Sequence, residues 1–163
     1  RLVERYDADL EVLEQPVGTL DIEGTKAVRE ATSIPVEIDE SAFSLPMVHR
    51  FLKADAVDVI NTKCAKASGI KGVRQWAIAA LAADREIVIG TEWGSSAIVA
   101  AKLHLGAAVA NASPVVEFTE IMIHELLMKD PPELHDGYID VPTSPGLGFE
   151  LDDDKIERYR TPD

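Results

Sequence analysis

Short apolar runs alternate with amphipathic segments along most of the chain. The apolar runs are rich in β-branched residues and predict five strands, at Leu10–Leu13, Pro35–Ile38, Ala56–Asn61, Glu86–Gly90 and Pro114–Phe118. The intervening segments repeat apolar residues at helical spacing and predict helices at 22–32, 46–53, 70–83 and 95–110. Strands that alternate with helices in this way predict repeated β-α units and therefore a parallel sheet.

Polar and ionisable residues follow the predicted strands. They include Glu14, Asp39, Glu40, Lys63 and the string Thr91-Glu92-Trp93. In a closed barrel the carboxyl ends of successive strands converge on one face, so these residues would line a single site. In an open sheet they would be spread along an edge, and no G-x-G-x-x-G string supports the dinucleotide-binding form of that sheet. The pattern therefore favours part of a barrel.

The C-terminal region has a different character. From residue 129 onward the chain is rich in proline, glycine and aspartate, which predicts an extended C-terminal wrap over 129–163 with a short helix at 153–159. Residues 1–128 would then hold the barrel units. A complete barrel needs eight units and about 250 residues, so 163 residues with five predicted strands correspond to part of one.

Composition and charge narrow the class of ligand. The chain is 46% hydrophobic and 28% charged, as in an ordinary globular protein, and its net charge of −13 argues against nucleic acid as a partner. No apolar run reaches the length of a membrane helix, and the single cysteine fits a reducing compartment. We therefore expect a cytoplasmic protein that binds a small molecule.

Glu14, Asp39 and Lys63 form a chemically suggestive set at the ends of three successive strands. Carboxylates are the oxygen ligands that Mg²⁺ prefers, and a metal that binds a substrate carboxylate stabilises the enediolate formed when the α-proton leaves. A nearby cation favours the neutral amine of a lysine, which is the form that accepts a proton. Taken singly, each residue is more readily explained as a solvated loop charge, whereas the three together leave the two interpretations evenly balanced.

Four strings resemble the enolase superfamily in its muconate-lactonizing branch. Leu-Glu-Gln-Pro at 13–16, Ile-Asp-Glu-Ser at 38–41 and the lysine-containing string at 60–70 are similar to that family's fourth, fifth and sixth strand ends. The tail strings at 136–142 and 145–151 are similar to its closing segment. The resemblance implies an α/β fold, namely the C-terminal portion, about strands 4 to 8, of a (β/α)8 TIM-type barrel of the modified enolase type.

The same resemblance implies roles for the strand-end residues. Glu14 and Asp39 would bind Mg²⁺, and Lys63 would be an acid/base catalyst on one face of the substrate α-carbon. Five further residues would be supporting or close to the substrate: Glu40, Asn61, Lys66, Glu92 and Trp93. Glu40 could pair with Lys63 or form an outward salt bridge, and Trp93 is as readily an ordinary packing residue.

The implied reaction is Mg²⁺-dependent abstraction of the proton α to a carboxylate. It would give racemisation, epimerisation or dehydration of an amino-acid-like substrate, with the string at 91–96 resembling members that act on proline- or betaine-type acids. A lactone-forming cycloisomerase and a non-catalytic barrel fragment are the alternatives. The family's capping domain, first strands, opposing lysines and third metal carboxylate would all lie upstream. We therefore expect the isolated chain to be inactive and to have the N-terminal half and homo-oligomer contacts as partners.

Other candidate sites are weaker. His124 and Glu125 begin like a zinc-protease helix, but Met128 stands where the second histidine would be. His104 lies in an apolar segment and is interpreted as a packed residue. Cys64 directly follows Lys63, so its side chain should point toward the helices and be inert.

Overall fold

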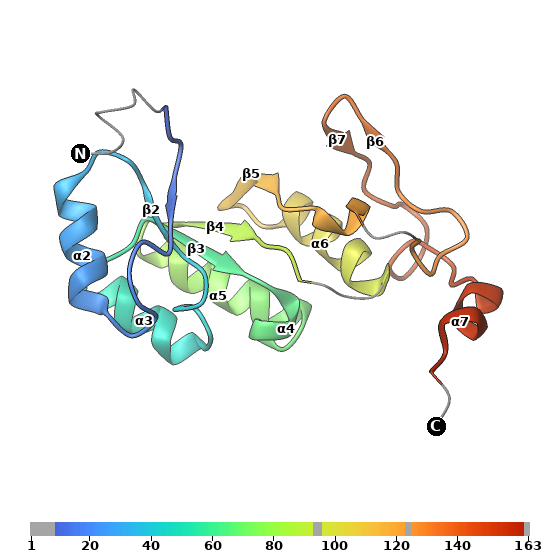
Figure 1. The fold of residues 1–163 in the computed structure, drawn as a ribbon, viewed down its shortest axis with the longest axis horizontal. Coiled ribbons are helices and arrows are strands. Elements are labelled where there is room, and N and C mark those ends of the chain that lie inside the picture. Colours follow the sequence, from blue (N-terminus) through green and yellow to red (C-terminus); the bar gives the residue numbers. More distant parts are fainter. Residues whose placement is uncertain (1–8, 93–95, 123–124, 162–163) are drawn as a thin grey trace.

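Five parallel strands form the centre of the molecule in the computed structural model, which describes residues 9–92, 96–122 and 125–161 (Figure 1). The strands are β1 (Leu13–Glu14), β2 (Val36–Ile38), β3 (Val59–Thr62), β4 (Glu86–Ile89) and β5 (Ala112–Val116). They pair in the order in which they occur in the chain, and every pairing is parallel. This confirms the predicted parallel sheet of β-α units.

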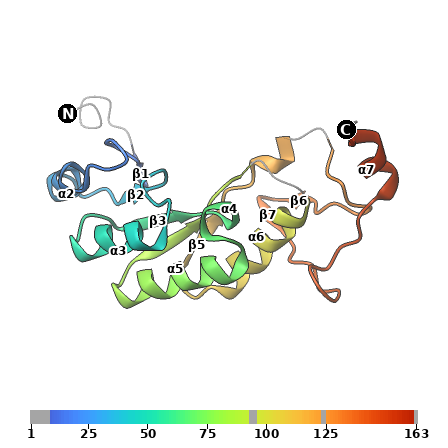
Figure 2. The ribbon, with the colours of Figure 1, turned by 90° about the horizontal axis from the view of Figure 1, so that it is seen from below.

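The helices that connect the strands cover one side of the sheet (Figure 2). They are α2 (Ile22–Ala31), α3 (Leu45–Lys53), α4 (Cys64–Ala67), α5 (Ile70–Ala82) and α6 (Ser96–Ala108), and a 3-10 turn η1 (Thr119–Met122) follows β5. Side chains cap the N-termini of α2 and α3: the Asp21 carboxylate accepts from the Gly24 amide, and the Ser44 hydroxyl accepts from the Met47 amide. The helix predicted at 95–110 begins at a position outside the described residues.

The hydrophobic core lies between the sheet and these helices. Ile38, Ile60 and Ile87 come from successive strands and are fully buried against Phe51 and Trp76 of the helices. Since successive strand side chains point to opposite faces, the residues beside these isoleucines point away from the helices. That second face lines a hollow of about 270 Å³, and it is the face on which the ionisable residues gather.

The C-terminal region extends beyond the sheet. Met128 is buried and forms a β-bridge with Leu151, and β6 (Leu134–His135) pairs antiparallel with β7 (Tyr138–Ile139). The final helix α7 (Asp153–Tyr159) is capped by the Asp152 carboxylate, which accepts from the Lys155 amide. The helix was predicted and the hairpin was not. The division at residue 128 stays a prediction.

Strand limits differ from the predicted ones by up to three residues. The first strand begins at Leu13 instead of Leu10, and the third at Val59 instead of Ala56. Ala56 and Val57 are fully buried although they precede β3, so an apolar run extended the predicted strand into a packed loop. No helix in the described ranges has the length and apolarity needed to cross a membrane.

Candidate metal and proton-transfer site

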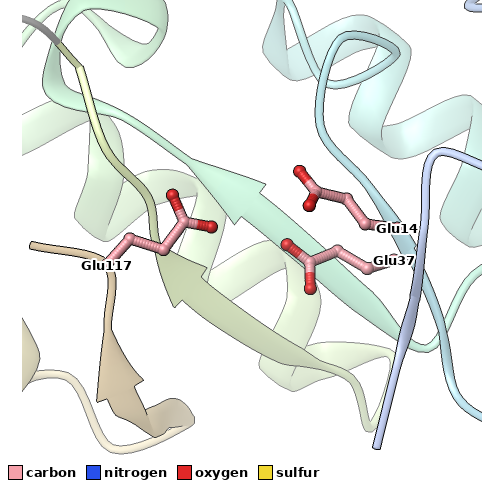
Figure 3. Close-up of side chains that lie close together, drawn as sticks. All are labelled: Glu14, Glu37 and Glu117. Atoms are coloured by element: carbon pink, nitrogen blue, oxygen red, sulfur yellow. The ribbon is translucent and has the colours of Figure 1, made fainter. Parts of the chain in front are cut away.

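Three carboxylates from separate strands meet on the face of the sheet away from the helices. Glu14 ends β1, Glu37 lies in β2 and Glu117 directly follows β5. One oxygen from each lies within 4.8 Å of the others, and Figure 3 shows the three side chains turned toward one another. The Asn61 amide joins two of them, donating to Glu37 Oε1 at 2.8 Å and to Glu117 Oε1 at 2.9 Å.

The electrostatics of this acidic cluster oppose full ionisation. Burial, together with the charges of Glu14 and Glu117, raises the pKa of Glu37 to about 7 against the opposing hydrogen bond from Asn61. Burial also raises the pKa of Glu14, together with the charges of Glu117 and Asp39. A divalent cation would relieve this repulsion, and carboxylate oxygens are suitable ligands for Mg²⁺. The donor set of this face therefore fits the metal that the sequence predicts.

Asp39 lies beside the acidic cluster and is held by two lysines. Lys63 Nζ lies 2.6 Å from Asp39 Oδ1 and 2.5 Å from Oδ2. Lys66 Nζ lies 2.5 Å from Asp39 Oδ1 and also donates to the carbonyl oxygens of Asp39 and Asn61, both at 2.9 Å. Burial alone would raise the pKa of Asp39, but the hydrogen bonds and charges of the two lysines outweigh it and hold this pKa below its usual value.

Lys66 is the more constrained of the two lysines. Burial lowers its pKa, and the ion pair with Asp39 opposes this effect without cancelling it. Its three acceptors belong to the ends of β2 and β3, so the side chain ties these strand ends together. Lys63 makes its two contacts with the Asp39 carboxylate alone among the described residues, which leaves it the lysine better placed to exchange partners.

The other predicted site residues differ in how close they lie to the carboxylates and lysines described above. Asn61 is fully buried between two carboxylates, as described above. Glu92 lies three residues after β4, and its carboxylate accepts from the Ala65 amide at 2.7 Å. Glu40 is exposed, and Lys63, one of the two partners considered for it, pairs with Asp39 instead. Trp93 lies outside the described residues.

Two members of the acidic cluster, Glu37 and Glu117, were not singled out from the sequence. Glu37 precedes Asp39 by two positions, so the two-residue period of a strand places both on the same face. The available signal was a charged residue between two apolar ones, Val36 and Ile38, in a predicted strand. In the structure both of those neighbours are fully buried. Glu117 carries a similar signal, because it lies between Val116 and Phe118 in the predicted fifth strand, but its meeting with Glu14 depends on how the five strands are arranged in space.

A second lysine–carboxylate pair lies away from this face. Lys102 of α6 and Glu120 of η1 are 1% and 0% exposed, and Lys102 Nζ lies 2.9 Å from each Glu120 oxygen. The same ammonium lies 5.6 Å from the centre of the Phe118 ring. This pair joins a covering helix to the segment after β5 and was also missed in the sequence.

The remaining candidates take the roles expected of packed residues. Cys64 is buried, and burial together with the charge of Glu92 raises the pKa of its thiol to about 11, so it is unreactive. His104 is half-buried, and its Nε2 lies 3.1 Å from the carbonyl oxygen of Leu147. His124 lies outside the described residues.

Comparison with known proteins points to one family. Residues 1–155 match the family described as enolase C-terminal domain-like. Muconate cycloisomerase 1-2 of Acinetobacter lwoffii is 28% identical over 94% of this chain and 40% of its own length. L-Ala-D/L-Glu epimerase of Bacillus subtilis is 29% identical over 91% of the chain and 41% of its own length. N-succinyl-L-Arg/Lys racemase of Bacillus cereus is 30% identical over 91% and 40%, respectively.

Solved structures agree with these relatives. The muconate lactonizing enzyme from Pseudomonas putida superposes with a TM-score of 0.88 at 26% identity, over 94% of this chain and 43% of that one. A substrate-liganded L-Ala-D/L-Glu epimerase from Bacillus subtilis superposes with a TM-score of 0.84 at 29% identity, over 91% and 41%. The chain thus spans about 40% of the length of these relatives. The five parallel strands are the C-terminal portion of the barrel, as predicted.

Proposed function

The chain belongs to the enolase C-terminal domain-like family, and on that premise we propose that it carries two Mg²⁺ ligands and one catalytic lysine of an isomerase acting α to a carboxylate. The observation that supports this proposal is the contact between Lys63 and Asp39 at the strand ends beside Glu14. A proton-accepting amine and oxygen ligands for a cation are thereby adjacent. Related proteins named as cycloisomerases, epimerases and racemases agree with chemistry of this class.

Glu14 and Asp39 are the proposed metal ligands. Bound Mg²⁺ would stabilise negative charge that develops on a substrate carboxylate as the α-proton leaves. Glu37 and Glu117 lie within reach of Glu14 and add carboxylate oxygens at the same place, and a cation there would relieve the repulsion that opposes their ionisation. In the structure the Asp39 carboxylate faces two ammonium groups, so its role as a ligand requires that Lys63 change partner.

Lys63 is the proposed acid/base group. Its ammonium is part-buried on the face that the carboxylates share, where it can deliver a proton to, or as the free amine remove one from, an α-carbon held in front of it. Lys66 and Asn61 would hold the ends of β2 and β3 in place around it. Glu40, Glu92 and Trp93 remain proposed as supporting or substrate-proximal residues.

Racemisation, epimerisation or dehydration of an amino-acid-like acid is the reaction we propose. The concentration of carboxylates on one face favours a substrate that carries a cationic group besides its carboxylate. A lactone-forming cycloisomerase is the second candidate, because several relatives are named muconate or chloromuconate cycloisomerases. The second base and the third metal carboxylate are proposed to come from an N-terminal half, in keeping with a chain that spans about 40% of its relatives.

Mg²⁺ binding and proton exchange together test this proposal. We expect Mg²⁺ to raise the melting temperature weakly for the chain alone and strongly when the N-terminal half is supplied, since saturation at a hundredfold excess over Kd contributes about 2.7 kcal/mol. Exchange of the substrate α-proton with deuterium, followed by NMR, should require both the ion and the N-terminal half.

The matched variants are Glu14→Gln with Asp39→Asn, and Glu23→Gln as an exposed control on α2. The first pair should abolish the Mg²⁺ effect, and the control should keep it. A reassembled protein that gains neither stability from Mg²⁺ nor proton exchange would identify a non-catalytic barrel fragment. Tight stoichiometric binding by the chain alone would mean that the missing ligands were assigned to the wrong half.

A further inference from the structure

Lys63 is the single residue that connects β3 to α4. The residue is the N-cap of α4, with an extended backbone (φ −134°, ψ 145°), and its own side chain makes no capping hydrogen bond. Its carbonyl oxygen accepts from the Ala67 amide at 2.9 Å. The lysine side chain carries donors only and cannot accept from the first amides of α4, so these amides need an acceptor from elsewhere.

Glu92 supplies that acceptor from the neighbouring strand end. Its Oε2 accepts from the Ala65 amide at 2.7 Å, two residues after Lys63. The backbone at the carboxyl end of β4 is itself tied to β3, because the Gly90 amide donates to the Thr62 carbonyl at 2.8 Å. Glu92 therefore fixes the residues that follow Lys63 to the same strand pair that carries Lys63.

Gly90 shapes the path of the lysine side chain from the same strand end. A Cβ at this position would lie 3.0 Å from Lys63 Cε and 2.0 Å from Asn61 Oδ1. Asn61 cannot move aside cheaply, because it is fully buried and holds two carboxylates. The segment after β4 thus affects Lys63 in two ways: Gly90 leaves room for its side chain, and Glu92 anchors the backbone that follows it.

We propose that Glu92 is a positioning residue for Lys63: by capping α4 at Ala65 it holds the Lys63 backbone so that the amine faces the reacting carbon. This inference rests on the proposed function and assigns to Glu92 a hydrogen-bonding role in place of contact with substrate. It predicts a defect confined to the Lys63 face of the substrate, whereas a general loss of structure would affect both faces.

The experiment compares Glu92→Ala, Glu92→Gln and a control, Glu86→Gln, whose carboxylate is exposed at the other end of β4. In the protein that includes the N-terminal half, α-proton exchange is followed for each enantiomer by NMR. Glu92→Ala should slow exchange at the Lys63 face about tenfold, the equivalent of one lost helix cap, and leave the opposite face unchanged. Glu92→Gln should stay within about twofold of the parent, because the amide oxygen still accepts from Ala65.

Two further measurements separate this inference from the proposed function. Lys63→Ala combined with Glu92→Ala should be no slower than Lys63→Ala alone, since Glu92 is proposed to act only through Lys63. Amide hydrogen exchange at Ala65 should become about tenfold faster in Glu92→Ala, whether or not the protein turns over a substrate.

Equal losses on both faces, a loss in Glu92→Gln as large as in Glu92→Ala, or unchanged exchange at Ala65 would each overturn the role assigned to Glu92. If the parent protein exchanges no α-proton, the proposed function fails, and Ala65 alone decides whether Glu92 anchors the Lys63 backbone. Faster exchange at Ala65 would then support the anchor, and unchanged exchange would refute it.

Discussion

Two lysine–carboxylate pairs in this chain have similar geometry and different surroundings. Lys63 and Asp39 are 17% and 12% exposed on the face that gathers the acidic residues, and Lys66 shares the carboxylate. Lys102 and Glu120 are 1% and 0% exposed and contact each other beside an aromatic ring. The first pair is partly open to solvent and lies beside other charged groups, while the second is sealed from solvent. The open pair is therefore suited to chemistry, and the sealed pair to holding α6 against the segment after β5.

The largest effect is expected from removing the open lysine. Lys63→Ala should reduce α-proton exchange at one face of the substrate by about 100- to 10,000-fold, the range for a general acid or base, and spare the enantiomer served by the opposite base. Arginine should not restore the rate, because guanidinium stays protonated at the working pH. NMR exchange on both enantiomers in deuterated buffer measures this.

Lys53→Ala, at an exposed position of α3, is the control for the loss of a positive charge. Full turnover of both enantiomers by Lys63→Ala would remove it from the chemistry and leave it a structural partner of Asp39. The contrast between the two pairs would then be one of exposure only.

Removing the sealed lysine should act on stability. Lys102→Met leaves the Glu120 carboxylate buried without a partner, which should lower the free energy of unfolding by about 3–5 kcal/mol. The double variant Lys102→Met with Glu120→Leu should recover most of this loss, because no buried charge is left. Urea denaturation gives the free energies. Lys129→Met, which breaks an exposed pair with Glu150, should leave the midpoint unchanged. A double variant as unstable as the single one would mean that the pair itself is stabilising.

Glu37 offers a third case beside the two lysine–carboxylate pairs. Its buried carboxylate accepts a hydrogen bond from the Asn61 amide and pairs with no lysine of the described residues. Its pKa is raised from 4.5 to about 7, so between these values the folded protein keeps a proton that the unfolded chain releases. Stability should therefore fall as pH rises from about 5 to 7, by at most about 1.4 kcal/mol per pH unit, and the loss is complete above the folded pKa. The lowered pKa of Asp39 has the opposite sign and acts at lower pH.

Thermal unfolding at several pH values measures this slope. Glu37→Gln should flatten it, and Glu86→Gln, an exposed carboxylate on β4, should not. An unchanged slope in Glu37→Gln would assign the pH dependence to another member of the acidic cluster.

Most of the fold could be predicted from the sequence, because the strands and helices of a parallel sheet leave local patterns of apolar residues. All five strands and the five predicted helices lie where apolar periodicity places them, within a few residues. The hairpin of β6 and β7 was missed because each strand is two residues long and lacks an alternating pattern. The turn between them falls at Asp136 and Gly137, residue types that favour turns, and both residues have positive φ.

The site, like the fold, has a part that could be predicted from the sequence and a part that could not. Strand ends indicated Glu14, Asp39 and Lys63 as candidates, since a parallel sheet places the carboxyl ends of its strands at one edge. The sequence alone determined which residue types stand at those ends and that the chain forms β-α units. Only the tertiary structure decided that Asp39 is shared by two lysines, that Glu117 meets Glu14, and that Lys102 pairs with Glu120. These partners are 18 to 103 residues apart or on different strands, and their meeting depends on sheet curvature and helix packing, which no local pattern encodes.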